Sequence, residues 1–243
     1  MKGEADDPGP AAFGGDAMKR RELLAGLGAA SVTSALPGAS AFAQTAAGVC
    51  VLTPVTSEGP FYFDPKLVRA DITEGKPGVA LELVLRVITV GDCASIKEAR
   101  ADVWQSDAMG VYSGYDKQAG TGKERTLSAT GKTFLRGTQF TDESGAAVFK
   151  TIYPSWYTGR TPHIHFKVFV GGDRVVTSQV VFPEEINNEI FGKVGPYKAR
   201  DPARDTFNAN DAYLKNGLLG VMCNIQRKGH GYRATVDVGV KKV

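Results

Sequence analysis

The sequence predicts an all-β fold, an antiparallel β-sandwich built as a single domain. Residues 81–87 (LELVLRV) alternate between apolar and polar positions, which is typical of a strand with one buried face. Residues 140–152 (FTDESGAAVFKTI) are predicted to form a strand, an Asp-Glu-Ser-Gly turn and a second strand. Short segments of this kind recur with no internal repeat and no change in composition, which indicates one sandwich and not a chain of modules.

The remaining elements follow from the same pattern. Residues 163–170 (HIHFKVFV) form a predicted strand with Ile164, Phe166 and Val168 on one face, because residues two apart point to the same side. Residues 184–217 are expected to be irregular or partly helical. Three further segments with strand character are 101–108 (ADVWQSDA, the end of a strand), 175–182 (VVTSQVVF) and 232–240 (YRATVDVGV).

The overall composition is that of a globular protein. Hydrophobic residues make up 42% of the chain and charged residues 23%, which are ordinary fractions. The formal net charge of +3 is small, and Lys and Arg are scattered. We therefore expect no nucleic-acid partner.

The first 43 residues have the character of an export segment. Residues 1–17 are acidic and rich in Gly and Pro, and we interpret them as an extension upstream of a start at Met18. An Arg-Arg pair at 20–21 resembles a twin-arginine signal, with an ordinary secretory signal as the alternative. The uncharged stretch 23–43 ends in a small-x-small cleavage pattern, and interruptions by Gly, Ser, Thr and Pro argue against a stable membrane anchor. The predicted domain is 44–243, exported to the periplasm or secreted.

The three cysteines, Cys50, Cys93 and Cys223, allow one disulfide and one free thiol. Export leads to an oxidising compartment in which a disulfide persists, but the sequence leaves the pairing open. No CxxC or Cys/His finger spacing is present, so we expect no thiolate metal site.

A histidine pair at 163 and 165 stands out in a chain with only three histidines. Both side chains project from one face of the predicted strand, a spacing suited to joint metal binding. The alternative is a pair of exposed strand histidines. No HExxH motif and no carboxylate lies nearby to complete a two-His-one-carboxylate triad. The nearby oxygen donors are tyrosines, and a phenolate is a hard anionic ligand suited to ferric iron once the metal lowers its pKa.

Four segments, in order along the chain, resemble the intradiol ring-cleaving dioxygenases, the family of catechol and protocatechuate dioxygenases. They are SEGPFYFD (57–64), WQSDAMGVYSGYD (104–116), FLRGTQFTDESGAAVFKTIYPSWYTGR (134–160) and TPHIHF (161–166). The similarity covers about residues 50–182 and fits the exported, stand-alone branch of the family best. The resemblance implies one Fe(III) per chain, held by four ligands: Tyr112, Tyr157, His163 and His165. Tyr115 and Tyr153 are competing tyrosines close by.

The resemblance also assigns residues around the iron. Arg160 matches the active-site arginine, and Gln179, fourteen residues after His165, matches the active-site glutamine. Gly59 and Pro60 match residues that line the substrate ring. The alternatives are a solvent-facing strand glutamine for Gln179 and a plain turn for the Gly-Pro pair.

The implied partners are a small aromatic diol and O2. In the family the diol chelates the iron through both oxygens, Tyr157 leaves the metal, and Tyr112 and the two histidines stay. Arg160 is then placed to stabilise the developing negative charge. Oxygen insertion between the two hydroxyl-bearing carbons gives a cis,cis-muconate-type dicarboxylic acid.

The sequence departs from the family pattern in places. The helical N-terminal segment that forms the dimer of catechol enzymes is not expected here, no second chain type is evident, and Ser155-Trp156 stands where Pro-Gly is common. Oligomeric state and ring substitution therefore stay open. Two other functions compete: a non-catalytic sandwich that binds aromatic ligands, and a zinc hydrolase using the same histidines. The complete donor set with Arg160 counts against the first, and the missing carboxylate base counts against the second.

Overall fold

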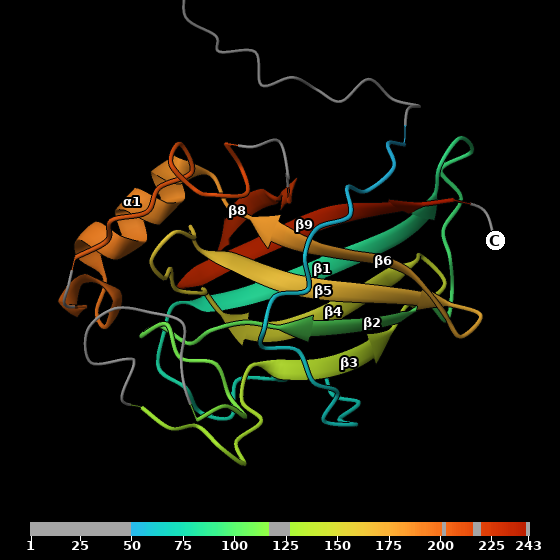
Figure 1. The fold of residues 1–243 in the computed structure, drawn as a ribbon. Coiled ribbons are helices and arrows are strands. Elements are labelled where there is room, and N and C mark those ends of the chain that lie inside the picture. The colour runs from blue at the N-terminus through green and yellow to red at the C-terminus, as the bar shows by residue number, and fades with distance from the viewer. Residues whose placement is uncertain (1–49, 117–126, 201–202, 216–219, 242–243) are drawn as a thin grey trace, which may run out of the picture. The chain divides into compact units, whose positions relative to one another are not determined.

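Two β-sheets pack face to face in the computed structural model, which describes residues 50–116, 127–200, 203–215 and 220–241. This confirms the predicted all-β sandwich (Figure 1). One sheet has four strands in the order β4 (Ala146–Ile152), β1 (Ala80–Thr89), β9 (Gly231–Val240), β8 (Asn224–Lys228). The other has five strands in the order β3 (Arg136–Phe140), β2 (Arg100–Trp104), β5 (His163–Val170), β6 (Asp173–Val181), β7 (Val221–Met222).

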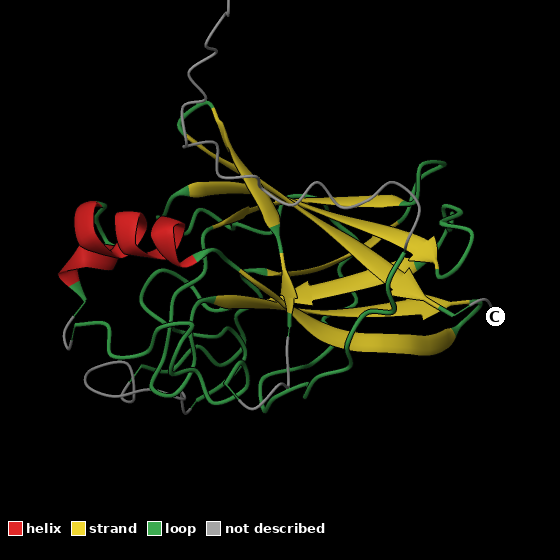
Figure 2. Ribbon diagram, turned by 90° about the horizontal axis from the view of Figure 1, so that it is seen from above, coloured by secondary structure: helices red, strands yellow, loops and turns green. Residues whose placement is uncertain are grey.

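Most strand pairs are antiparallel, as predicted, but β1–β9 and β6–β7 run parallel. A parallel pair needs a long crossover connection. Between β6 and β7 the chain makes helix α1 (Glu184–Lys193) and the 3-10 helix η2 (Tyr197–Ala199), so the prediction of a partly helical 184–217 is confirmed. Helix α1 lies at one end of the sandwich, outside the two sheets (Figure 2).

The core between the sheets is made by the predicted apolar faces. Leu81, Leu83 and Leu85 of β1 are buried there with Ile164 and Phe166 of β5. Each such side chain contributes about 1.5–3 kcal/mol of transfer free energy on burial. Strands β7 and β8 were not predicted, because β7 is two residues long and β8 (NIQRK) is largely exposed and lacks apolar alternation.

The predicted count of one disulfide and one thiol is confirmed, and the pair is Cys50–Cys93. Cys223 is a buried free thiol, and burial raises its pKa to about 12. The predicted export segment, residues 1–43, lies outside the described residues. The described residues belong to one compact unit, Thr45–Val243, and none of their helices is long and apolar enough to cross a membrane.

Candidate metal centre

Strand β5 carries the two histidines on its outer face, opposite the apolar face that packs in the sandwich. Both are 1% exposed, so the alternative of exposed strand histidines is wrong. His165 lies in a row of residues across four neighbouring strands. That row, set by the strand register, is Arg136, Trp104, His165, Gln179. Trp104 stacks on the imidazole of His165 with ring centroids 4.9 Å apart.

The two imidazoles present nitrogen lone pairs to a common point. His163 Nδ1 donates to the carbonyl of Thr161 at 2.7 Å, which leaves Nε2 as the nitrogen with a free lone pair. Nε2 of His163 lies 3.1 Å from Nε2 of His165. Burial, together with the Arg160 cation, holds the pKa of both histidines well below the usual value. Two neutral imidazoles in this geometry are suited to share a cation.

Tyr112 and Tyr157 complete the cluster that the resemblance implies. The Tyr112 hydroxyl lies 3.4 Å from His163 Nε2, and the Tyr157 ring lies 5.5 Å from the His163 ring, centroid to centroid. Tyr112 is fully buried, whereas Tyr157 is half-buried. Burial raises the pKa of both phenols, so each needs a cation to become a phenolate.

The competing tyrosines lie elsewhere. The Tyr115 hydroxyl donates to the carbonyl of Tyr62 at 2.8 Å. The Tyr153 hydroxyl donates to Asn187 of α1 at 2.7 Å, in the core between the sheets. The geometry therefore places Tyr112 and Tyr157, and not these two, beside the histidines.

The donor set fits ferric iron. The Nε2 atoms of the two imidazoles lie close together, the Tyr112 hydroxyl lies within 3.4 Å of one of them, and the Tyr157 ring packs beside the same imidazole. Across the described ranges, no group of three or more His, Cys, Asp or Glu side chains could hold a metal, so a metal here depends on the tyrosines. Anionic oxygen donors with imidazole suit a hard, high-charge ion better than the soft ions that thiolates bind.

Arg160 lies beside the cluster and is 6% exposed. Its Nε donates to Asp211 at 3.1 Å, and its Nη2 donates to the side-chain oxygen of Gln179. The side-chain nitrogen of Gln179 donates to the carbonyl of Ser57 at 3.1 Å. Gln179 is therefore buried and doubly bonded, and the alternative of a solvent-facing glutamine is wrong. Its amide links Arg160 to the segment around Ser57.

Residues 57–64, which we call the strap, cross the outer face of the five-stranded sheet. Gly59 has a φ of +71°, and a Cβ there would lie 3.3 Å from His165 Cε1, so the glycine lets backbone approach the imidazole. Phe61 stacks on Tyr112 with centroids 4.5 Å apart. Pro60, by contrast, is exposed. The strap thus forms one wall of the cluster, with Gly59 as its predicted contact.

An ion pair, a hydrogen bond and a cation–π contact hold the strap against the sheet. Glu58 pairs with Lys167, and the Tyr62 hydroxyl donates to Asp102 at 3.0 Å. The Lys167 ammonium lies 3.3 Å from the centre of the Tyr62 ring, a cation–π contact. Lys167 and Asp102 were not identified from the sequence, since their importance depends on what covers them. Asp211 was missed for the same reason.

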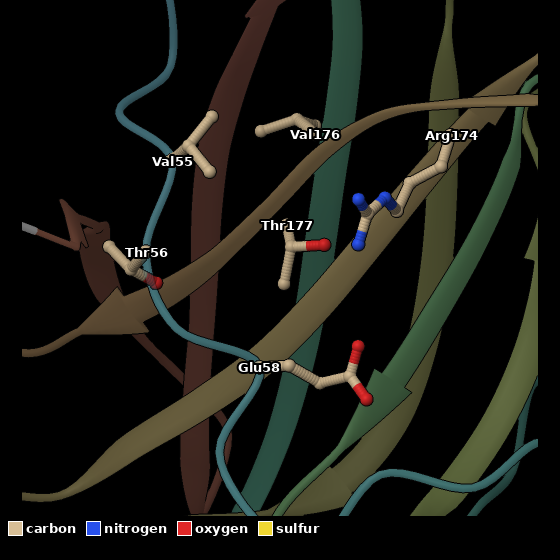
Figure 3. Close-up of a pocket in the computed structure, with 6 residues that line it drawn as sticks. All are labelled: Val55, Thr56, Glu58, Arg174, Val176 and Thr177. Atoms are coloured by element: carbon tan, nitrogen blue, oxygen red, sulfur yellow. The ribbon is translucent and has the colours of Figure 1, made fainter.

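Two surface hollows contain none of the four residues of the cluster. One of about 180 Å³ is lined by Val55, Thr56, Glu58, Arg174, Val176 and Thr177 (Figure 3). Another, of about 290 Å³, includes Arg100, Phe140 and Phe169. Neither hollow is lined by a candidate metal ligand. We therefore assign the site to the cluster of histidines and tyrosines, which carries the metal-binding side chains.

Comparison with known proteins is informative at the level of structure. No protein-family model and no curated protein matches the sequence. An intradiol ring-cleavage dioxygenase from Tetranychus urticae is 30% identical with a TM-score of 0.70, covering 79% of this chain and 95% of that chain. The dioxygenase domain of a carbohydrate-binding fusion protein from Streptomyces sp. SirexAA-E is 27% identical with a TM-score of 0.54, covering 79% and 100%.

More distant structures share the fold. The 3-chlorocatechol 1,2-dioxygenase of Rhodococcus opacus 1CP is 18% identical with a TM-score of 0.51, covering 78% of this chain and 72% of that chain. The sandwich, the sequence motifs and the 30% identity over nearly the whole Tetranychus protein agree. The chain belongs to the intradiol ring-cleavage dioxygenase family.

Proposed function

We propose that the protein is a non-haem Fe(III) intradiol dioxygenase that cleaves catechol-type aromatic diols with O2 to cis,cis-muconate-type dicarboxylic acids. The observation that carries the proposal is that Tyr112 and Tyr157 lie beside the buried pair His163–His165, with the Arg160 cation next to this cluster. One ferric ion per chain, held by these four residues, would supply the Lewis acidity that lowers the pKa of the diol hydroxyls.

The residues divide the remaining work. Tyr157 is the least buried of the four donors. It is therefore the donor that would leave the metal and accept a proton from a diol hydroxyl. Burial raises its pKa, which makes its phenolate an effective proton acceptor. Tyr112 and the two histidines are almost fully buried and keep their positions.

Arg160 stabilises negative charge as it develops on the substrate. Its guanidinium is held by Asp211 and Gln179 in a site with little access to water, and a fixed cation in such a site needs no reorganisation during reaction. Gln179 has both ends of its amide engaged, so we assign it to holding Arg160 and the strap. Gly59 gives the substrate ring a flat backbone wall beside His165.

The test is product analysis with catechol and O2. The proposal predicts equal consumption of catechol and O2 and a muconate-type diacid that contains both atoms of O2. The matched control is a His163→Ala/His165→Ala double variant, which is expected to produce none. Cleavage outside the two hydroxyl-bearing carbons, or hydrolysis of esters by a zinc form, would contradict the proposal.

We also propose that the chain is exported and that residues 1–43 are removed. The Arg-Arg signal pattern supports export, and so does the Cys50–Cys93 disulfide, since such bonds persist in oxidising compartments. N-terminal sequencing of the exported protein is expected to start near residue 44. Replacing the arginine pair by lysines is expected to retain the protein in the cytoplasm, and undiminished export would contradict the twin-arginine route.

A further inference from the structure

Residues 206–214, which we call the cover, close over the short hairpin that carries Tyr157 and Arg160. Within the hairpin, the backbone of Tyr157 and that of Arg160 exchange two hydrogen bonds of 2.8 and 3.2 Å. The cover binds the hairpin tip from outside: Gly159 N donates to the Thr206 hydroxyl at 3.0 Å, and Ala212 N donates to the Gly159 carbonyl at 3.1 Å. The cover is irregular, so its position depends on such individual bonds.

Asp211 is the fully buried centre of the cover, with 0% exposure. One carboxylate oxygen accepts from Arg160 Nε at 3.1 Å and from Thr161 N at 2.7 Å. The other accepts from the backbone nitrogens of Tyr213 and Leu214 at 2.8 and 3.0 Å. The carboxylate therefore joins the cover to the hairpin and satisfies four donors at once.

Two other side chains, Gln179 and Tyr213, also contact the Arg160 guanidinium. Its Nη2 donates to Gln179, and its central carbon lies 4.0 Å from the centre of the Tyr213 ring. A buried guanidinium without a carboxylate is strongly disfavoured. An arginine side chain is also long and flexible, so it keeps one orientation only where its partners are fixed. Of the contacts described, the Asp211 carboxylate is the one that supplies an opposite charge to Arg160.

We propose that Asp211 is a positioning residue of the dioxygenase site: it fixes the Arg160 guanidinium beside the four-donor cluster and so maintains turnover without touching metal or substrate. This inference rests on the proposed function. Neither the sequence motifs nor the family resemblance assigned a role to this residue.

The chemistry of the carboxylate suggests a sharp variant. Both oxygens of Asp211 accept from N–H groups, so in Asp211→Asn either orientation of the amide directs an NH2 at N–H donors. The variant keeps the size of the side chain but loses the hydrogen bonds accepted by one of the two oxygens, either those from the hairpin or those from the cover. Asp237→Asn is the matched control, because Asp237 also pairs with an arginine, Arg86, but on an exposed face of the four-stranded sheet.

The experiment is a double-variant cycle with Asp211→Asn, Arg160→Gln and the combination. We expect Asp211→Asn to lower kcat/KM for catechol about 10-fold or more, with iron content and the tyrosinate-to-iron band unchanged. In the Arg160→Gln background it is expected to lower kcat/KM by no more than about twofold, because residues that act through one another are not additive. Asp237→Asn is expected to match the wild type.

Two results would overturn the inference: Asp211→Asn lowers only the melting temperature and leaves kcat/KM within about twofold of wild type, or the losses multiply in the double variant. If Asp211→Asn does not fold, Asp211→Ser, which leaves a small acceptor, takes its place in the cycle. If the wild type does not turn over catechol, the proposed function fails by itself. In that case the Kd for catechol is measured without O2 for the same variants. A weaker affinity in Asp211→Asn that disappears in the Arg160→Gln background would support the role of Asp211, and an unchanged affinity would contradict it.

Discussion

The two faces of strand β5 are equally buried and chemically opposite. Ile164, Phe166 and Val168 on the inner face are 0% exposed and pack in the hydrocarbon core. His163 and His165 on the outer face are 1% exposed. Their neighbours are aromatic and polar side chains, among them Trp104, Tyr112 and Tyr157. Alternation along a strand usually separates a buried face from a wet one. Here it separates the hydrocarbon core from the donor cluster of the candidate metal centre.

Different coverings explain the contrast. The second sheet covers the inner face with apolar side chains, whereas the strap and the cover close the outer face with backbone, aromatic rings and ion pairs. Buried polar groups must find partners, so the outer face fixes its residues individually. The Nε2 atoms of His163 and His165 face each other at 3.1 Å on this face, and the proposed cation would bind there.

The largest expected effect comes from alanine substitutions on neighbouring positions of β5. His165→Ala is expected to lose most of the bound iron, because it removes a donor, while the iron-free protein loses little stability. Phe166→Ala is expected to bind iron but to lose about 3–5 kcal/mol of unfolding free energy through the cavity it leaves. Metal analysis and urea unfolding of the iron-free proteins measure both. If His165→Ala retained iron, the proposal that the outer face of β5 binds the metal would be contradicted.

A smaller effect is expected where the strap meets His165. Gly59 and Gly75 have nearly the same positive φ, +71° and +72°, but of the two only Gly59 would place a Cβ against a neighbour, at 3.3 Å from His165 Cε1. Alanine at either position is expected to cost about 1 kcal/mol of stability from backbone strain. Gly59→Ala is also expected to weaken catechol binding about fivefold, the equivalent of about 1 kcal/mol.

Anaerobic titration with catechol measures the difference between the two alanine variants. Gly75→Ala serves as the control for strain, since its Cβ meets nothing within 4 Å. Equal catechol affinities for the two variants would show that the strap does not shape the site.

The smallest effect is a pH dependence of the strap. The pKa of the Asp64 carboxyl is lowered from 3.8 to about 2, because the hydrogen bonds from Arg100 and Lys66 outweigh the opposing effect of burial. A pKa that is lower in the folded state means that Asp64 stabilises the fold above about pH 4 and loses this effect as the pH falls toward 2. The difference in melting temperature between wild type and Asp64→Asn is therefore expected to shrink over that range. A difference that grows on acidification would contradict the assignment.

The sequence predicted what depends on local periodicity. Strands β1, β4, β5, β6 and β9 were found because their apolar faces alternate, and the histidine pair followed from the same period. Tyr112 and Tyr157 came from motif resemblance, and the structure brings both beside the histidines. Short or exposed strands such as β7 carry no such period.

The residues that were missed depend on long-range geometry. Asp211 reaches Arg160 only because an irregular segment, 51 positions further along the chain, folds back over the hairpin.

Gln179 was identified by resemblance, but its position beside His165 depends on an irregularity in the β5–β6 pairing between Val168 and Phe169. Without it, the pairing at the hairpin turn would set Ser178 opposite His165 and point Gln179 into the core, because a one-residue slip reverses the faces. The amino-acid pattern does not specify that shift.

The central claim is that the outer face of β5 is a ferric site that chelates a diol. The most direct test is the iron content and visible spectrum of the purified protein, before and after catechol is added without O2. The account predicts about one iron per chain, as four convergent donors require, and a red-brown tyrosinate-to-iron band that shifts when catechol binds. Bound zinc, or a colourless protein that iron does not reconstitute, would contradict it.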